Sequence, residues 1–248
     1  MIPRDHPRYE SLVTREKLVE GVKMGITTLQ GLIAHGRGEA FDYILGEKTK
    51  DFALKAEKTA VAMMLLAKHP VISVNGNTAI LVPDKIKELA EILNAKIEIN
   101  VFHYSKERVA KIAEFLSNFG IDALCAGDSE LEGLSSARRI VDSRGILIAD
   151  VVLVPLEDGD RCEILKKNGK KVIAIDLNPL SRTARMADVT IVDNIIRAIP
   201  KMIELAKEMM NMSQGEIEEI IRTYDNKKIL SEAIDGIIGY LEETRRSL

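Results

Sequence analysis

The chain has 248 residues and a mass of 27.5 kDa, which fits one α/β domain with additional helices better than two full domains. Hydrophobic residues make up 46% and charged residues 29%, so the composition supports a packed core and excludes a disordered chain. Lysine and arginine total 35 against 38 aspartate and glutamate, which disfavours a nucleic-acid binder because neutralising many phosphates needs surplus cations.

The compartment can be predicted from what the sequence lacks. It has no apolar signal segment near its start and no run that approaches the roughly 18 apolar residues needed to span a bilayer. Cys125 and Cys162 lie far apart beside apolar runs, so we expect two buried, reduced thiols. These features predict a cytoplasmic protein with no membrane partner.

Residues 1–69 are expected to be mainly helical. Residues 8–24 place apolar side chains at helical spacing, and 51–68 form a stronger helix that should stop before Pro70, because proline cannot continue it. Between them, the glycines of 31–46 are expected to interrupt what would otherwise be a helix.

From residue 70 onward, short β-branched runs alternate with amphipathic stretches. Strands are expected at 71–75, 96–101, 151–155, 172–176 and 189–193, with a possible further strand at 123–126. Helices are expected at 84–94, 105–119, 195–210, 214–224 and 227–245. This order predicts a Rossmann-like, doubly wound, mostly parallel sheet. We assign one domain, in which a core over 70–194 joins an N-terminal helical segment, 1–69, to C-terminal helices, 195–248.

The last expected helix carries an apolar stripe that covers either a sheet face or a partner subunit, and the pattern favours neither. The stripe consists of Leu230, Ile234, Ile237, Ile238 and Leu241.

Ligands of an open parallel sheet bind beyond the carboxyl ends of its strands, so the polar residues there are the candidates for a site. The stretch after the expected strand at 172–176 gives the clearest indication of a ligand-binding site. Asp176 can accept hydrogen bonds from a ribose or hold hydrated magnesium, and Ser181 can cap a helix that bears Arg182 and Arg185. A solvated turn with surface arginines explains the same residues equally well.

Two other segments are weaker candidates. His35-Gly36-Arg37-Gly38-Glu39 would allow close backbone approach to an anion, but it lacks the third glycine of a dinucleotide fingerprint and follows no strand. Asn75-Gly76-Asn77 is better explained as a tight turn. The chain has no GxxxxGK[ST] loop, no GxSxG elbow and no histidine pair at metal-binding spacing, so no protein metal site is expected.

Taken together, these segments resemble the archaeal phosphopantothenate synthetases, also called 4-phosphopantoate–β-alanine ligases. The resemblance runs from about residue 5 to 200 and rests on HPRY at 6–9, RE at 15–16, GLIAHGRGEAFDY at 31–43, SVNGN at 73–77, VLVPLEDGD at 152–160 and VIAIDLNPLSRTAR at 172–185. It implies a homodimer that uses ATP and Mg²⁺ to join 4-phosphopantoate to β-alanine, giving AMP, pyrophosphate and 4′-phosphopantothenate for coenzyme A biosynthesis. It further implies ATP contacts at Arg15, Arg37, Asp176, Leu177, Asn178, Arg182, Thr183, Asn194 and Ile195.

Within that reaction we expect Arg37 to follow the charge that develops on the α-phosphate. Arg8 or Arg144 is expected to hold the 4-phosphate. Asn75, Asn77 and His35 are expected to hydrogen-bond the pantoyl group, and Glu39 to take a proton from the β-alanine ammonium.

Two other functions fit the same fold. A nicotinamide-dependent oxidoreductase would use Asp176 for the ribose, although the chain lacks GxGxxG, and quenching of NADH fluorescence would reveal it. A non-catalytic nucleotide-binding module would bind ATP without releasing pyrophosphate.

Overall fold

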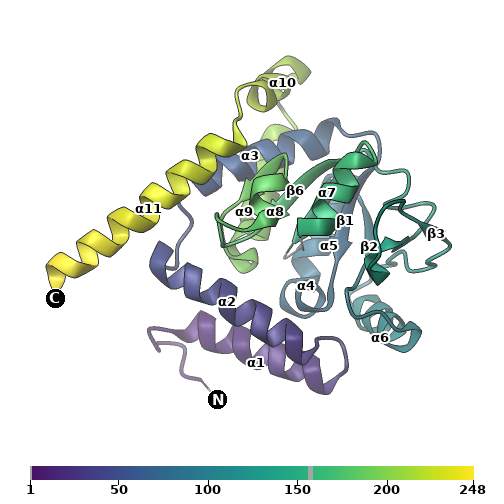
Figure 1. Cartoon of the computed structure of the whole chain (residues 1–248), viewed down its shortest axis with the longest axis horizontal. Helices are drawn as coiled ribbons and strands as arrows, with labels where there is room; N and C mark the ends of the chain where they lie inside the picture. Colours follow the sequence, from purple (N-terminus) through teal and green to yellow (C-terminus); the bar gives the residue numbers. More distant parts are fainter. Residues whose placement is uncertain (1, 156–158) are drawn as a thin grey trace.

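The computed structural model describes residues 2–155 and 159–248 and contains one five-stranded sheet (Figure 1). Its strands lie in the order β2-β1-β5-β6-β7, and all neighbours pair in parallel. The strands are β1 (Pro70–Val74), β2 (Lys96–Ile99), β5 (Val151–Pro155), β6 (Lys171–Ile175) and β7 (Val189–Ile191). Counted along the chain this order is 2-1-3-4-5, one of the two common doubly wound arrangements, so the fold-class prediction is confirmed.

Most helices before, between and after the strands lie where the sequence predicts them, but those over residues 29–45, 76–81 and 159–167 were not predicted. The helices are α1 (Tyr9–Lys23), α2 (Leu29–Leu45), α3 (Asp51–Leu66), α4 (Gly76–Leu81), α5 (Pro83–Ile92), α6 (Lys106–Ser117), α7 (Gly159–Lys167), α8 (Arg182–Met186), α9 (Ile195–Met209), α10 (Gln214–Arg222) and α11 (Asn226–Ser247). None of the helices within the described ranges is both long enough and apolar enough to cross a membrane.

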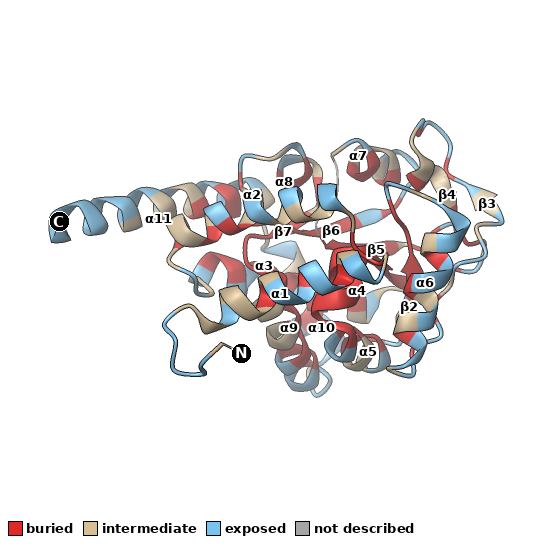
Figure 2. Cartoon of the chain, turned by 90° about the horizontal axis from the view of Figure 1, so that it is seen from below, coloured by how far each residue is buried: buried red, intermediate tan, exposed pale blue. Residues whose placement is uncertain are grey.

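Both faces of the sheet are buried, because alternate side chains of each central strand join different cores. Ile72 and Leu153 belong to the larger core, which they share with residues of α3, α5 and α9. Val71 and Val152, their neighbours along the strands, join a smaller core with Cys162 of α7. Figure 2 shows the buried residues concentrated along the strands and the inner sides of these helices.

The prediction that glycines break the 31–46 segment is wrong, because α2 is continuous from Leu29 to Leu45. The Thr28 hydroxyl accepts a hydrogen bond from the Gly31 amide at 3.0 Å and caps its start, and Gly46 ends it in a left-handed conformation at φ 85°. The tertiary packing of the helix therefore overrides a local preference that costs about 1 kcal/mol per internal glycine.

Asn75-Gly76-Asn77 is likewise not a tight turn but the start of α4, with Asn75 as the capping residue. A Cβ at position 76 would lie 2.2 Å from the Ile26 carbonyl oxygen and 2.8 Å from Nη2 of Arg108. The glycine is needed because backbone and guanidinium both press against this position.

Two smaller expectations also change, and one pair of strands was not predicted. Residues 123–126 form no full strand, and Leu124 makes only an isolated parallel bridge with Glu98 beside β2. A short antiparallel pair, β3 (Ser129–Glu130) with β4 (Ile140–Val141), follows it and was not predicted. Cys162 is buried as expected, whereas Cys125 is exposed, so the prediction of two buried thiols is wrong for Cys125.

The apolar stripe of α11 is divided between two environments. Leu230, at the start of the stripe, is buried together with its neighbours Ile229 and Ala233, and the helix contacts α3 and β7. Ile238 and Leu241, further along, are 51% and 48% exposed, and the helix projects away from the sheet toward the C-terminus (Figures 1 and 2). The first half of the helix therefore covers the core, whereas in the second half Tyr240 lies beside Gly46 and the Lys50 ammonium while Ile238 and Leu241 stay exposed.

Candidate functional site

The site is organised by α2, which lies across the carboxyl edge of the sheet (Figure 1). The Asn77 side chain, just after β1, donates to the Gly31 carbonyl at 2.9 Å. Leu177, just after β6, lies 3.6 Å from the place where a Cβ of Gly38 would be. The glycines of α2 thus let the helix approach the ends of two strands, which explains their presence better than a chain break does.

One cavity opens beside α2 at the end of β1, where the strand order reverses between β1 and β5. It has a volume of about 320 Å³, and we call it the arginine cavity because Arg37, Arg108 and Arg138 line it. Among the described residues of its lining none is aspartate or glutamate; the others are Thr28, Gln30, Gly31, Ala34, Asn75, Gly76, Asn77, Val101, Phe102 and His103. Such a lining favours a ligand with negative charge.

The two asparagines of this cavity differ in how many of their side-chain hydrogen-bonding groups already have a partner in the protein. Asn75 Oδ1 accepts from the Thr78 amide at 3.0 Å, and its Nδ2 donates to the Pro155 carbonyl at 2.9 Å. Asn77 uses its Nδ2 on Gly31, and its Oδ1 accepts from no donor within the described ranges. Asn75 therefore holds the strand ends in place, and Asn77 keeps an acceptor for a ligand hydroxyl.

The loop after β6 has the predicted capping arrangement. Asp176 accepts hydrogen bonds from the Ser181 hydroxyl at 2.5 Å and the Asn178 amide at 2.9 Å, and Ser181 caps α8. Burial raises the pKa of the Asp176 carboxyl, while these two hydrogen bonds and the nearby charge of Arg37 act in the opposite direction. Arg37, exposed on α2, is thus close enough to Asp176 to connect this loop with the arginine cavity.

Several other residues that were expected to contact ATP have side chains that are paired or buried, and these are less available to a nucleotide. Arg182 makes ion pairs with Asp160 and Glu163 of α7. Leu177, Thr183 and Ile195 are buried, at 5% exposure or less, so a nucleotide would meet their backbone. The VLVPLEDGD motif continues into residues 156–158, which lie outside the described residues.

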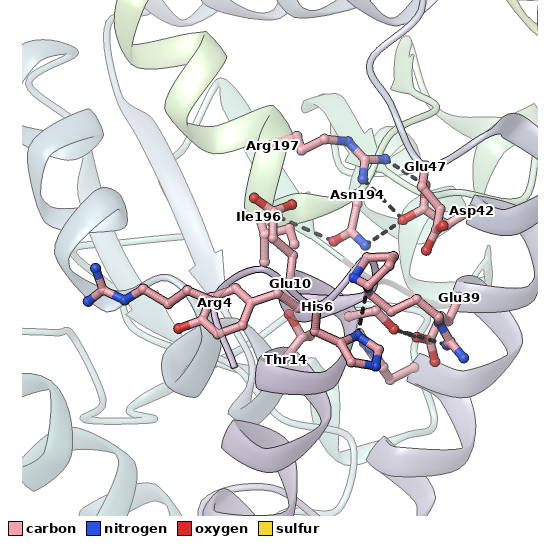
Figure 3. A pocket seen from close by; sticks show the side chains of 15 residues that line it. Arg4, His6, Glu10, Thr14, Glu39, Asp42, Glu47, Asn194, Ile196 and Arg197 are labelled. Carbon is pink, nitrogen blue, oxygen red and sulfur yellow. Dashed lines mark hydrogen bonds and ion pairs between the residues drawn. The ribbon is translucent and has the colours of Figure 1, made fainter. Parts of the chain in front are cut away.

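A second cavity, also of about 320 Å³, lies on the other side of α2, against α1 and the start of α9 (Figure 3). We call it the α1–α2 cavity. Asn194 donates to Asp42 at 2.8 Å, and Arg197 makes ion pairs of 2.6 Å with both Asp42 and Asp193. Figure 3 shows Asn194 and Arg197 directed at Asp42, and these contacts join α9 to α2.

His35 and Glu39 line the α1–α2 cavity, whereas Arg37 lines the arginine cavity. Arg15 holds Glu39 with an ion pair of 2.9 Å, and the Ser11 hydroxyl donates to Glu39 at 2.5 Å. Burial acts to raise the pKa of Glu39, but the hydrogen bonds from Arg15 and Ser11 outweigh it and the pKa is lowered. Burial also lowers the pKa of His35, so this imidazole is neutral at neutral pH.

The two arginines predicted to hold the 4-phosphate lie apart from the arginine cavity. Arg8 lines the α1–α2 cavity, with its guanidinium 5.0 Å from the centre of the Tyr43 ring. Arg144 lies beside the start of β2, near Lys96, and pairs with Asp142 at 3.2 Å. The amino end of β2 is at the opposite edge of the sheet from the cavities around α2.

Arg108 and Arg138 were not among the candidate residues, and little in the sequence could have indicated them. Arg108 lies in the first turn of an amphipathic helix, where an arginine is ordinary. Arg138 belongs to a short 3₁₀ turn, Ala137–Arg139, far from any predicted strand end. Only the folded chain places these two side chains with Arg37.

The chain is similar over nearly its whole length to proteins of known name. A profile of the family described as "Phosphopantothenate/pantothenate synthetase" matches residues 52–240. Proteins named 4-phosphopantoate–β-alanine ligase from Methanosarcina mazei and Thermococcus kodakarensis are both 56% identical, over 97% and 94% of this chain and 96% and 90% of theirs. One of the same name from Methanospirillum hungatei is 48% identical over 96% of each chain. The resemblance inferred from the motifs is confirmed, and the chain belongs to the phosphopantothenate/pantothenate synthetase family.

Proposed function

We propose that this protein is an ATP-dependent ligase that joins 4-phosphopantoate to β-alanine and releases AMP and pyrophosphate. The names of its relatives give the reaction class. The observation in the structure that carries the proposal is the arginine cavity, which gathers three cations and no carboxylate, within its described lining, at the switch point of a nucleotide-binding type of sheet.

The reaction needs an activated carboxyl group, because a carboxylate resists attack by an amine. In the first step a carboxylate oxygen of phosphopantoate bonds to the α-phosphorus of ATP, and the bond from that phosphorus to the bridging oxygen breaks to release pyrophosphate. In the second step the β-alanine nitrogen bonds to the acyl carbon and AMP leaves with its oxygen. The nitrogen must arrive as a neutral amine, because an ammonium group has no lone pair to form the bond, and it gives up one further proton as the amide forms.

The main task of the protein is to hold two polyanions together. Phosphopantoate and ATP repel each other, and their reacting atoms must come within about 3.5 Å. Arg37 is suited to this task because it lines the arginine cavity and also influences Asp176 at the end of β6. It makes no ion pair with any described residue, so its guanidinium is available to the reacting phosphate.

Magnesium accompanies ATP in reactions of this kind, where it neutralises charge on the departing pyrophosphate. Within the described ranges no group of three or more histidine, cysteine, aspartate or glutamate side chains is placed to hold a metal ion. Such an ion would be carried mainly by phosphate oxygens and water, and Asp176 is the carboxylate that we expect to assist them.

We propose that β-alanine enters through the α1–α2 cavity, because Glu39, the residue expected to meet its ammonium group, lines this cavity. Glu39 has a lowered pKa, so it stays ionised and suits a partner for the ammonium group more than a strong base. His35 lies in the same cavity in its neutral form and can accept a proton.

The products of one incubation test the function. With ATP, 4-phosphopantoate and β-alanine we expect equal amounts of AMP, pyrophosphate and 4′-phosphopantothenate, and none of them when phosphopantoate is left out. Nucleotides resolved by chromatography give the answer. ADP in place of AMP would exclude the adenylate route, and ATP binding without pyrophosphate release would leave a binding module.

We also propose that the protein is a homodimer, as the resemblance implies. Exposed apolar side chains occur on α2, where Leu29 and Ile33 are 66% and 67% exposed, and on the second half of α11, where Ile238 and Leu241 are exposed. Apolar surface of this kind marks association sites in soluble proteins. We expect light scattering on the eluted protein to give about twice the chain mass, and a monomer mass at micromolar concentration would contradict this.

A further inference from the structure

The α1–α2 cavity differs from the arginine cavity because its lining carries both signs of charge. Its charged side chains include Arg8, Glu10, Glu39, Asp42, Glu47 and Arg197. The described lining of the arginine cavity, in contrast, contains arginines and no carboxylate. Carboxylates in the lining repel a triphosphate, so the α1–α2 cavity better suits a small ligand that itself carries one positive and one negative group.

Arg8 is the cation of this cavity whose charge is available to a ligand. Arg197 is ion-paired with Asp42 at 2.6 Å, and the neighbouring Arg15 is ion-paired with Glu39 at 2.9 Å. Arg8 makes no ion pair with any described residue, and its contacts are with a hydroxyl group and an aromatic ring. A negative group of a ligand would therefore find Arg8 without a competing carboxylate.

Neutral groups hold the Arg8 guanidinium in place. Its Nη2 donates to the Ser11 hydroxyl at 3.3 Å, and the guanidinium carbon lies 5.0 Å from the centre of the Tyr43 ring, within the range of a cation–π interaction. Within the described ranges, neither Nε nor Nη1 has a hydrogen-bond partner, and Nε is buried. The guanidinium is thus oriented before a ligand arrives, while most of its donors are still unused.

The Ser11 hydroxyl connects this cation to a carboxylate. It accepts from Arg8 and donates to Oε1 of Glu39 at 2.5 Å, so the two charged groups lie on either side of one hydroxyl. Oε1 of Glu39 also accepts from Arg15, whereas Oε2 accepts only from Arg15 Nε, at 3.0 Å. Because a carboxylate oxygen has two lone pairs, Oε2 can accept a further hydrogen bond from a ligand ammonium.

We propose that Arg8 binds the carboxylate of β-alanine while Glu39 binds its ammonium group, so that the α1–α2 cavity recognises the zwitterion by both ends. This inference rests on the proposed function. Among the three substrates of that reaction, β-alanine is the one that carries an ammonium and a carboxylate together. The assignment replaces the expectation that Arg8 holds the 4-phosphate, and it makes Arg8 a residue that selects the amino acid.

Initial rates of AMP formation by the full chain test the assignment, with Arg8→Gln compared against the wild type. We expect KM for β-alanine to rise by a factor of about ten to a hundred, the range of one lost charge-assisted contact. KM for ATP and KM for phosphopantoate should each change less than about threefold, because neither substrate contacts Arg8.

The first half of the reaction gives a readout that a general structural defect would also change. Labelled pyrophosphate enters ATP by reversal of adenylate formation, which needs phosphopantoate but not β-alanine. We expect this exchange in Arg8→Gln to stay within about twofold of the wild-type rate.

A β-alanine analogue without the negative charge tests the contact itself. 3-Aminopropanamide keeps the amine and replaces the carboxylate by an amide. The wild type should prefer β-alanine to this amide, and Arg8→Gln should lose that preference, because the group that distinguishes the two has been removed.

Lys17→Gln is the matched control, since Lys17 is an exposed cation of the same helix, α1, outside the lining of both cavities. It should leave every KM unchanged. Arg8→Lys keeps the charge but not the guanidinium fork, so its KM for β-alanine should lie between the other two. It also takes the place of Arg8→Gln if circular dichroism shows the glutamine variant to be unfolded.

The outcomes separate this inference from the proposed function. Wild-type protein that forms no AMP from the three substrates would overturn the function itself. An active wild type whose Arg8→Gln variant keeps its KM for β-alanine would overturn only the inference. So would a rise confined to KM for phosphopantoate, which would return Arg8 to the 4-phosphate, or a rise confined to KM for ATP, which would assign it to the nucleotide.

Discussion

Replacing Arg37 by alanine should lower kcat/KM for phosphopantoate by about two to three powers of ten, with more of the loss in kcat than in KM. Arg37 is exposed on α2, lines a cavity without carboxylates in its described lining, and makes no ion pair with the described residues. A cation without an ion-pair partner among the described residues can follow the charge that develops on the α-phosphate. Its loss should therefore raise the free energy of the transition state more than that of the bound substrate.

Two variants make the measurement specific. Arg37→Lys keeps the charge but loses the guanidinium fork, so its kcat/KM should lie between those of the wild type and the alanine variant. Lys23→Ala removes a cation from the neighbouring helix α1, where Lys23 is paired with Glu20 at 3.1 Å and exposed, and it should have no effect. A loss of less than threefold in Arg37→Ala would reduce this residue to a surface cation.

Replacing Glu57 by methionine should stabilise the protein at alkaline pH. Glu57 lies in α3, is 0% exposed, and neither of its carboxyl oxygens has a hydrogen-bond partner in the described part of the chain. Burial first, and then the negative charge of Asp193, raises its pKa to about 9. The carboxyl group is consequently protonated and neutral in the folded enzyme at pH 7.

The sign of the pH dependence follows from the two states of this proton. The unfolded chain releases it near the ordinary value of 4.5, while the folded chain keeps it until about 9. The folded state therefore binds more protons across this interval, and the contribution of Glu57 to stability is complete below pH 4.5 and declines as the pH rises toward 9. Glu57→Met removes this decline.

We expect the methionine variant to unfold at a temperature several degrees above that of the wild type at pH 8, because an unsatisfied buried carboxyl costs about 1–3 kcal/mol. Melting curves at pH 5, 7 and 9 should show the difference widening with pH. Glu114→Met, at an exposed position of α6, is the control and should change stability by less than about 0.5 kcal/mol. A variant that melts below the wild type at pH 9 would contradict this account of Glu57.

The sheet was predictable because its strands are buried on both faces and therefore appear as continuous apolar runs. Val71, Val152 and Val172 lie in such runs, and the structure confirms them as members of β1, β5 and β6. The capping role of Ser181 was also predictable, since a short hydroxyl side chain before a helix acts on amides only three residues away. Interactions of this range are determined by neighbouring sequence.

Segment 31–46 shows where local reasoning fails. Its glycines indicate a break, yet Gly31 and Gly38 serve contacts with Asn77 and Leu177, which lie far along the chain. No residue within the segment indicates that Asn77 and Leu177 will be its partners. Asn75 is a different case, because its cap on the Thr78 amide is as local as that of Ser181, but an Asn-Gly pair after a strand also suits a tight turn.

The sequence by itself determined the fold class, the family and the motifs that carry them, because these depend on residue patterns that neighbouring positions share. The tertiary structure alone decided which side chains meet. It separated His35 and Glu39 from Arg37 on two sides of one helix, placed Arg144 at the far edge of β2, and joined Arg108 and Arg138 to Arg37. These contacts depend on how α2, α6 and the 3₁₀ turn pack against the strand ends. Contacts between residues so far apart in the chain produce no periodic pattern in the sequence.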